Sequence, residues 1–295
     1  MEKVKLIGIG LAFVVLVIGA LLYLDYHVFT GSLSTPMSNS SISTPNLPTQ
    51  AEISSILPNW KIVSLGEINS SQVLNGIYPD ADALYQEYLQ EEGNNQSIIS
   101  ILILHFPGQP NAAQQVPHTV IGDYVIMVNG TGISNNEQLA ILNLAREVFV
   151  GHNGTSLTLP NFFYPSTSSL PLVEYVVAYL NTSEGQFTQY SVYYLSSGIN
   201  SGESVGVNVV EGNNSTQLYN YLYSTTKISS NQTQSGPESL ATNGTFDGAR
   251  YFNISTTGPY GSTYYFVALK GNYVVLTQSQ PLPDFQLFEY IITKL

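Results

Sequence analysis

The chain lacks cysteine altogether. This absence excludes disulfide bonds, Cys-ligated zinc, iron–sulfur clusters, c-type haem and thiol catalysis. Ionisable side chains are also scarce: Asp, Glu, Lys and Arg make up 9% of the 295 residues, against about 25% in an average soluble protein. Basic residues are the scarcest, with 8 Lys and Arg against 20 Asp and Glu and a net charge of −12. Such a balance argues against a nucleic-acid partner.

What is present is enough for a folded core. Hydrophobic residues make up 43% of the chain, so wholesale disorder is not expected. The length of 295 residues suffices for one large domain or two ordinary ones. Ser, Thr, Asn, Gln and Tyr, including 21 tyrosines, take the place of charge on the polar surface.

A long apolar run near the N-terminus indicates a membrane anchor. Residues 6–24 contain no charged side chain, and as a helix they are about 28 Å long, close to the roughly 30 Å hydrocarbon core of a bilayer. Lys3 and Lys5 precede the run and Asp25 follows it. Because positive residues stay in the cytoplasm, we expect residues 1–5 to form a cytoplasmic tip and the bulk of the chain to be extracytoplasmic.

A cleaved signal peptide is the alternative interpretation of this run. Its apolar stretch is usually about 7–15 residues long and ends at a small-x-small site, whereas residues 21–26 read LLYLDY. We therefore predict an uncleaved, single-pass anchor in the cell membrane. Residues 25–50, rich in Ser, Thr, Pro and Asn from Gly31 onward, are predicted to form a stalk, because such a composition buries too little apolar surface to fold.

Asn-x-Ser/Thr triplets support the same topology. One such triplet is weak evidence, because a chain rich in Asn, Ser and Thr forms them by chance. Many of them behind a membrane anchor predict N-linked glycans on an extracytoplasmic surface. The candidate glycosylation sites are Asn39, Asn69, Asn95, Asn129, Asn153, Asn181, Asn213, Asn214, Asn231, Asn243 and Asn253.

Two segments of the chain resemble each other. Residues 122–127 (GDYVIM) and 271–276 (GNYVVL) each follow one apolar run and contain another, which is the pattern of a β-hairpin with a two-residue turn. Each hairpin leads into a predicted helix. The first helix begins with a capping box at Ser134 and Glu137, and the second is capped by Asp284.

Each half also contains a predicted helix upstream of its hairpin, over residues 80–92 and 215–227. A strand is predicted on either side of each helix, so the repeated unit is β-α-β-β-β-α. Two extra strands are predicted over residues 172–182 and 187–196. The predicted flanking strands cover residues 61–68, 97–106, 204–211 and 248–256.

These elements predict an α+β fold, in which an N-terminal single transmembrane helix is followed by two similar β-α-β-β-β-α units with antiparallel sheets. The first unit is expected over residues 51–151, and the second, with the extra strands, over residues 171–295. Residues 152–170 are expected to form a linker, because they are rich in Gly, Asn, Thr, Ser and Pro. A coincidental likeness between two ordinary α+β stretches is the alternative.

Residues with catalytic potential form no recognisable constellation. Ser204 lies in a G-x-S-x-G string, but it opens a predicted strand, whereas a nucleophilic serine needs a strand-to-helix turn. Asp80 and Asp82 begin a predicted helix, where carboxylates favour the helix dipole. Weak surface binding of a divalent ion is the alternative, although the cluster lacks the glycine of a calcium loop. The other acids of this cluster are Glu87, Glu91 and Glu92.

The histidines and the remaining acids are scattered. His105 and His118 would approach one another if residues 97–106 and 115–121 paired as strands, which gives a metal or proton-shuttle alternative to an ordinary hydrogen-bonded imidazole. No two acids are fixed at a separation that suits paired-carboxylate hydrolysis, and we expect no metal and no cofactor. The other residues considered are His27, His152, Glu174, Glu203, Glu211 and Asp247.

These features predict a non-enzymatic, membrane-anchored extracytoplasmic glycoprotein that serves as a structural or interaction subunit of a cell-surface or membrane assembly. Its expected partners are the bilayer through residues 6–24, other proteins of the membrane or envelope, and N-linked glycans, with no nucleic acid. An accessory subunit of a respiratory or transport complex is one alternative, since Gly8, Gly10 and Ala12 provide small residues for helix packing. An extracellular hydrolase with an unrecognised carboxylate site is the other.

The scarcity of charge also predicts stability in acid. Acid unfolds proteins largely by protonating carboxylates that are paired in the native state, and a fold with few ion pairs has little of that stability to lose. The composition resembles that of secreted proteins from thermoacidophilic archaea, in which low charge, abundant Tyr, Ser and Asn, and absence of Cys occur together. We therefore expect the medium outside the membrane, in which the folded part of the chain is predicted to lie, to be acidic.

Overall fold

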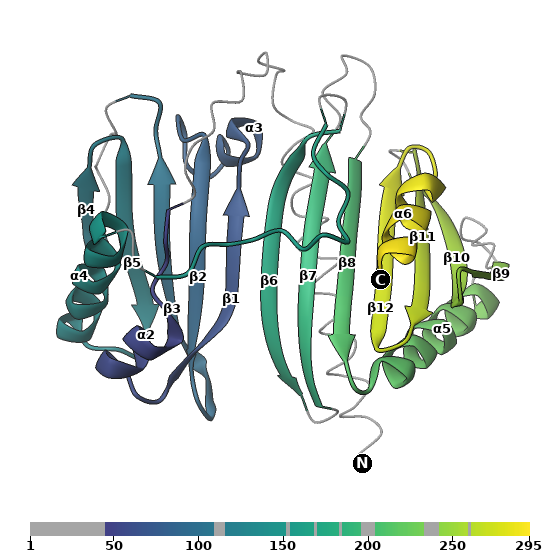
Figure 1. Ribbon diagram of the computed structural model, residues 1–295, viewed down its shortest axis with the longest axis horizontal. Helices are drawn as coiled ribbons and strands as arrows, with labels where there is room; N and C mark the ends of the chain where they lie inside the picture. The colour runs from purple at the N-terminus through teal and green to yellow at the C-terminus, as the bar shows by residue number, and fades with distance from the viewer. Residues whose placement is uncertain are drawn as a thin grey trace.

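The computed structural model describes residues 45–108, 116–151, 154–167, 170–182, 185–195, 204–232, 242–258 and 261–295. Among them a single antiparallel sheet of twelve strands runs through the molecule, in the order β4-β5-β3-β2-β1-β6-β7-β8-β12-β11-β10-β9 (Figure 1). The strands are β1 (Trp60–Ile68), β2 (Ala83–Glu91), β3 (Asn94–His105), β4 (His118–Ile121), β5 (Tyr124–Thr131), β6 (Leu172–Thr182), β7 (Gly185–Leu195), β8 (Ser204–Gly212), β9 (Thr242–Phe246), β10 (Ala249–Gly258), β11 (Gly261–Lys270) and β12 (Tyr273–Gln280).

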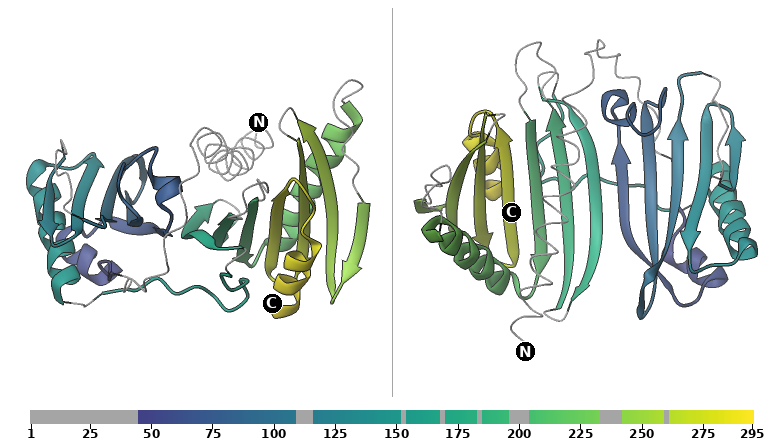
Figure 2. Two further views of the ribbon diagram at one scale, coloured as in Figure 1. Left: turned by 90° about the horizontal axis from the view of Figure 1, so that it is seen from above. Right: turned by 180° about the vertical axis from the view of Figure 1, so that it is seen from behind.

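Helices accompany the sheet on both faces. In the orientation of Figure 1, α2, α4 and α6 pack on the face that we call the front, and α3 and α5 pack on the back. Figure 2 shows α2 and α6 on one side of the sheet and α3 and α5 on the other. The helices are α2 (Gln50–Ile56), α3 (Ser71–Leu74), α4 (Asn135–Gly151), α5 (Ser215–Gln232) and α6 (Phe285–Lys294).

The predicted fold of two similar α+β units is wrong, because the described strands form one mostly antiparallel β-sheet. Residues 64–68 of β1 pair with residues 174–178 of β6 and join the two halves of the sheet. The segment predicted as a helix over residues 80–92 is strand β2, paired on both sides. The two matching hairpins also occupy different places, because β4 is an edge strand whereas β11 lies between β10 and β12.

Several predicted elements are confirmed. The turns at Gly122 and Gly271 both adopt a φ of 58°, the left-handed conformation that glycine tolerates best. The capping box of α4 is present: the backbone N–H of Ser134 donates to Oε2 of Glu137 over 2.8 Å, and Oγ of Ser134 accepts from the backbone N–H of Glu137 over 3.3 Å. Asp284 caps α6 by accepting a hydrogen bond from the backbone N–H of Leu287.

A strap, residues 154–167, crosses the front face between the two halves of the sheet (Figure 1). Leu157 packs against the hydrophobic clusters of both halves. Phe163 is 2% exposed and lies in the cluster of the second half. Two tyrosines of the sheet hold the strap's backbone, since the hydroxyl of Tyr175 donates to the carbonyl of Thr158 and that of Tyr194 to the carbonyl of Tyr164.

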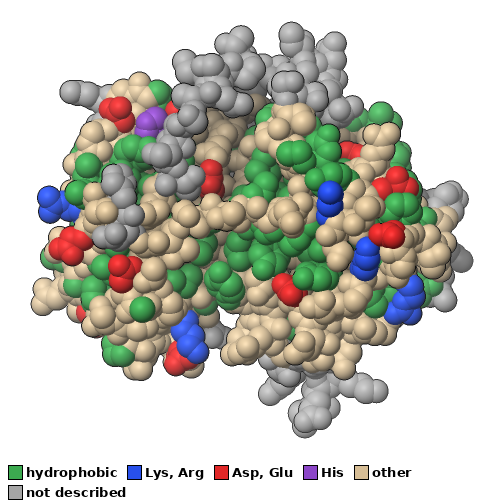
Figure 3. Space-filling view, viewed as in Figure 1, with side chains coloured by type: hydrophobic (Ala, Val, Ile, Leu, Met, Phe, Trp, Pro, Cys, Tyr) green, Lys and Arg blue, Asp and Glu red, His purple; other side chains and the backbone are tan. Residues whose placement is uncertain are grey.

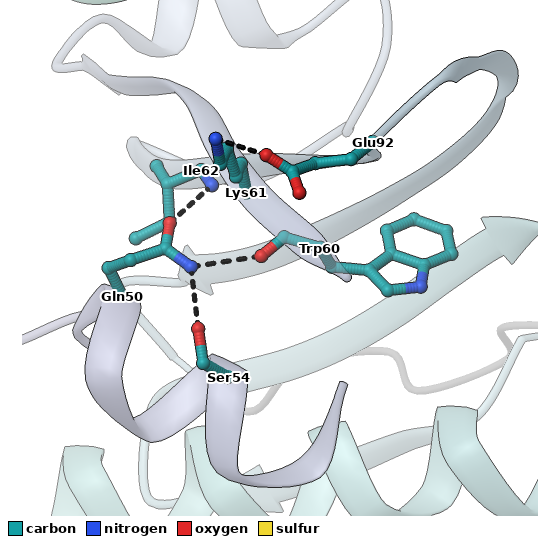
Figure 4. A network of polar contacts seen from close by, with 6 residues as sticks. All are labelled: Gln50, Ser54, Trp60, Lys61, Ile62 and Glu92. Atoms are coloured by element: carbon teal, nitrogen blue, oxygen red, sulfur yellow. Dashed lines mark hydrogen bonds and ion pairs between the residues drawn. The ribbon is translucent and has the colours of Figure 1, made fainter. Parts of the chain in front are cut away.

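The first described residues of the chain lie beside the start of this strap. Leu47 and Thr155 exchange two backbone hydrogen bonds, over 3.0 and 2.8 Å. Helix α2 then begins, and Figure 4 shows how Gln50 ties it to β1: its Nε2 donates to the carbonyl of Trp60 over 2.9 Å, and its Oε1 accepts from the backbone N–H of Ile62 over 2.8 Å. Helix α2 is therefore fixed to the sheet through backbone groups of β1.

No helix among the described residues is long and apolar enough to cross a membrane. The predicted anchor, residues 6–24, the stalk before residue 45 and the candidate sites Asn39 and Asn153 lie outside the described residues.

Candidate functional site

The predicted acidic cluster is dispersed, because β2 replaces the expected helix. Glu87 points into the front core, whereas Glu91 and Glu92 lie at the far end of the strand, next to the turn into β3. Asp80 and Asp82 precede the strand, so their interpretation as helix-dipole residues is wrong. Asp80 instead takes a left-handed backbone conformation, with a φ of 71°.

His105 and His118 do not approach one another. β5 lies between β3 and β4, so the two strands that carry the histidines are not neighbours. His105 is opposite Tyr124, and His118 is opposite Met127. Those two positions on β5 are three residues apart and point to opposite faces of the sheet. The strand pairing on which the metal or proton-shuttle alternative depended is therefore absent.

His105 has a carboxylate partner instead. Its Nδ1 lies 2.5 Å from Oδ1 of Asp82, and the two side chains are 15% and 32% exposed. The imidazole also packs against the ring of Tyr124, with ring centroids 4.7 Å apart. A carboxylate that orients an imidazole recurs in catalytic sites, but there the imidazole must in turn contact a nucleophile. Within the described part of the chain the imidazole of His105 contacts Asp82 and Tyr124, neither of which is activated by it as a nucleophile, so the geometry supplies an orienting pair alone.

Ser204 lies where the sequence placed it, at the start of a strand. It opens β8, is 8% exposed, and is followed by eight further strand residues. A nucleophilic serine of the G-x-S-x-G type would be followed by a helix. The interpretation as an ordinary strand start is confirmed. Glu203 lies outside the described residues.

A carboxyl group is buried without a partner beneath α2. Glu87 has no exposed surface, and neither of its carboxyl oxygens makes a hydrogen bond within the described part of the chain. Its cross-strand neighbours, Leu65 and Ile101, are apolar. Burial, with a smaller contribution from Glu52 of α2, raises the pKa of Glu87 to about 8. The carboxyl is therefore neutral in an acidic medium.

Two further carboxyl groups have raised pKa values. Burial raises the pKa of Glu67, against a hydrogen bond from Asn69 that lowers it. Burial also raises the pKa of Glu174 to about 7. The registers of β1, β2 and β6 place Glu67 and Glu87 on the front face and Glu174 on the back. Glu174 therefore forms no carboxylate pair with either of the other two.

A group of aromatic side chains, which we call the tyrosine platform, lies on the front face over β6, β7, β8 and β12. We use this name for Phe162, Tyr179, Tyr190, Tyr273 and Glu211. The ring of Phe162 lies 5.6 Å from that of Tyr190 and 6.4 Å from that of Tyr273, measured between centroids. Hydrophobic side chains gather near the middle of this face in Figure 3.

The polar member of the platform is Glu211. Its Oε1 accepts hydrogen bonds from the hydroxyl of Tyr273, over 3.1 Å, and from the side-chain amide of Asn272, over 3.3 Å. The register continues from Glu211 through Thr188 of β7 to Tyr179 of β6. Tyr179 is 46% exposed and presents the most open ring of the group.

The platform suits a neutral ligand better than an anionic one. Lys270 lies opposite Tyr273 at the β11–β12 turn. Its ammonium group donates to Asp247 over 2.8 Å and to the carbonyl of Ile292 over 2.7 Å, so it is already engaged. Aromatic rings next to a hydrogen-bond acceptor suit a ligand with apolar faces and hydroxyl groups.

Most of the candidate glycosylation sites with described side chains are accessible. Asn214 and Asn253 are half-buried, and Oδ1 of Asn253 accepts hydrogen bonds from Thr242. The side chains of Asn95 and Asn231 lie outside the described set. The exposed sites are Asn69, Asn129, Asn181, Asn213 and Asn243.

Asn181 and Glu211 were recognisable in the sequence, as a sequon and as an acid on a predicted strand, but their connection with Tyr179 was not predicted. A signal was present, because Tyr179 and Asn181 are two residues apart in a correctly predicted strand, and such residues share a face of the sheet. The contribution of Phe162 was not predictable, because it depends on the path of the strap.

No group of three or more His, Asp or Glu side chains among the described residues is placed to hold a metal ion. Comparison with known proteins found no matching family model, no matching curated protein and no matching solved structure.

Proposed function

We propose that the protein is a single-pass, membrane-anchored extracytoplasmic glycoprotein that acts as a non-enzymatic structural or interaction subunit of a cell-surface or membrane assembly. The observation that carries the proposal is the pairing of an uncharged apolar run, residues 6–24, with exposed sequon asparagines on the folded part of the chain. An N-linked glycan is bulky and needs room at the surface of the folded chain. Asn69, Asn129, Asn181, Asn213 and Asn243 meet that condition.

The chemistry of the described surface supports a binding role over a catalytic one. Asp82 orients the imidazole of His105, and the imidazole packs against the ring of Tyr124. The carboxyl group of Glu87, whose pKa is raised, is enclosed in an apolar core. The tyrosine platform, by contrast, reaches the surface at the exposed Tyr179, and rigid aromatic side chains provide contact area at a small cost in conformational entropy.

Membrane topology and glycosylation are tested together. The full-length chain is expressed in a host that attaches N-linked glycans outside the cytoplasm, and intact cells are treated with protease. We expect the folded part to be accessible from outside, the chain to stay with the membrane in alkaline carbonate, and peptide mass spectrometry to find glycans on several of the exposed sites. A chain that is released from the membrane and carries no glycan would overturn the proposal.

Membership of an assembly needs a separate experiment. The chain is extracted with a mild detergent from the cells that naturally make it, sized under native conditions, and analysed for co-purifying proteins. We expect stoichiometric protein partners. Recovery as a partner-free monomer would contradict the assembly role while leaving the glycoprotein assignment intact.

A further inference from the structure

Tyr179 and Asn181 present their side chains side by side on the front face. They are two residues apart in β6, opposite Thr188 and Gln186 of β7, in a stretch of ladder without a bulge. Alternate residues of a strand share a face and lie about 7 Å apart along it. Both side chains are exposed, and Tyr179 is 46% exposed. A group attached to the Asn181 amide would therefore start next to an open aromatic ring.

An open tyrosine ring at the edge of the platform leaves apolar surface in water. Tyr190 and Tyr273 are half-buried, and Phe162 of the strap packs against both of them. Tyr179 lies on the same face, opposite Thr188 of β7, and is 46% exposed. Covering it removes apolar area from water, and this is favourable in proportion to the area covered.

We propose that the N-linked glycan of Asn181 folds back onto the tyrosine platform and packs its first sugar against the ring of Tyr179. The inference rests on the proposed function, in which the chain is glycosylated. Pyranose sugars have an apolar face of C–H groups that matches an aromatic ring, and hydroxyl groups around the rim that need hydrogen-bond partners. Thr188 of β7 and then Glu211 of β8 follow Tyr179 across the ladder on the same face and offer polar groups to those hydroxyls.

Other described sequons lack this arrangement. The residue two positions before Asn69 is Glu67, and the residue two positions before Asn213 is Glu211. Before Asn129 it is Met127, which is 2% exposed. None of the three provides an open ring on the same face.

Asn253 is the instructive comparison, because Tyr251 precedes it by two positions. The ring of Tyr251 packs against Phe285 and Phe288 of α6, with centroids 6.0 and 5.5 Å away. The side chain of Asn253 is itself engaged with Thr242. An aromatic residue two positions before the asparagine is thus not sufficient, and the open ring of Tyr179 distinguishes the Asn181 site.

The test is a double-mutant cycle on the full-length, glycosylated chain. The variants are Tyr179→Ala, Asn181→Gln and the two combined, and glycan occupancy at Asn181 is measured by peptide mass spectrometry. We expect Tyr179→Ala to lower the unfolding midpoint by about 2–4 °C when the glycan is present and to have much less effect in the Asn181→Gln background. Tyr179→Phe keeps the ring and should behave like the parent chain.

A matched control uses Asn129→Gln, which removes a glycan from an exposed strand position without an open ring beside it. The effect of Tyr179→Ala should be the same with and without Asn129→Gln. Nitration of Tyr179, followed by peptide mass spectrometry, gives a second readout: we expect slower modification in the parent chain than in Asn181→Gln.

The possible failures can be told apart. An occupied Asn181 with no coupling to Tyr179 and no protection from nitration overturns the stacking inference alone. An empty Asn181 on a chain glycosylated elsewhere also overturns this inference and leaves the glycoprotein assignment standing. Absence of glycan at every site overturns both.

Discussion

Glu87 lies directly opposite Ile101 in the ladder between β2 and β3, so a carboxyl group is held against a fully buried isoleucine. On the other side of the strand its partner in the ladder is Leu65. A carboxylate anion has no compensating charge in such surroundings, whereas the neutral acid is tolerated much better. This relationship predicts that the stability of the fold depends on pH.

Replacing Glu87 with Gln should remove much of that dependence. The pKa of Glu87 is raised from 4.5 to about 8 in the folded chain, so the folded state binds this proton more tightly than the unfolded state does. The stability that comes from the proton is present below pH 4.5 and is lost as the pH rises through 8. We expect Glu87→Gln to match the parent at pH 4 and to exceed it at pH 9 by up to about 5 kcal/mol, measured by denaturant unfolding.

Glu87→Leu serves as a companion variant, because it also removes the unpartnered polar atoms. It should be more stable than the parent at both pH values. A parent chain and a Glu87→Gln chain that lose stability in parallel between pH 4 and pH 9 would show that Glu87 is not the titrating group.

The whole chain should be more stable in mild acid than in alkali. Glu174, with its pKa raised to about 7, and Glu67, with a pKa raised by burial, act in the same direction as Glu87. Glu137 acts in the opposite direction, because the hydrogen bonds from Ser134 lower its pKa. We expect the melting temperature of the described fold, measured by circular dichroism, to decrease as the pH is raised from 5 to 9. A chain that is stable at pH 7 but unfolds reversibly near pH 4 would contradict this prediction. It would also contradict the prediction of an acidic medium outside the membrane.

Gly154 should be intolerant of a side chain. It adopts a φ of 111°, and a Cβ there would lie 2.3 Å from the carbonyl oxygen of Leu47 and 2.7 Å from Cγ1 of Val148. We expect Gly154→Ala to cost more than the roughly 1–2 kcal/mol of left-handed strain, because the bridge between Leu47 and Thr155 must also shift. Gly122→Ala is the matched control: it carries a positive φ but meets nothing within 4 Å, and equal losses for both would argue against the clash.

The strap should contribute to the stability of the second half of the sheet. Phe163 is 2% exposed and packs against the rings of Phe162 and Tyr175. Phe163→Ala leaves a cavity in that cluster, and we expect a loss of about 3–5 kcal/mol in denaturant unfolding. Leu159, half-buried on the same strap, provides the comparison, with a smaller loss on truncation to Ala. A loss below 1 kcal/mol for Phe163→Ala would mean that the strap is dispensable.

Local signals in the sequence predicted much of the secondary structure. The turns at Gly122 and Gly271 and the caps at Ser134 and Asp284 depend on residues close in the chain, and these predictions are confirmed. The 80–92 segment failed because its apolar residues fit either period. In the sheet, β2 has neighbours on both sides and buries side chains on both faces, and such a context outweighs intrinsic propensity.

Strand order and the candidate site depend on partners that are distant in sequence. Nothing near residues 97–106 indicates that β5 inserts between β3 and β4, and this insertion separates His105 from His118. The pairing of β1 with β6 is equally remote in the chain. The platform combines side chains of β6, β7, β8 and β12 with one from the strap. The sequence therefore shows its aromatic residues but does not indicate that they lie together.

The bridge between Leu47 and Thr155 also has a mechanical consequence. The chain N-terminal to Leu47 meets the described fold at this pair of backbone hydrogen bonds, and Thr155 belongs to the strap that spans both halves of the sheet. Tension applied from that end reaches these two bonds and the strap before it reaches β1. A pull applied at Leu47 is therefore expected to be shared, through Thr155 and the strap, between the two halves of the sheet.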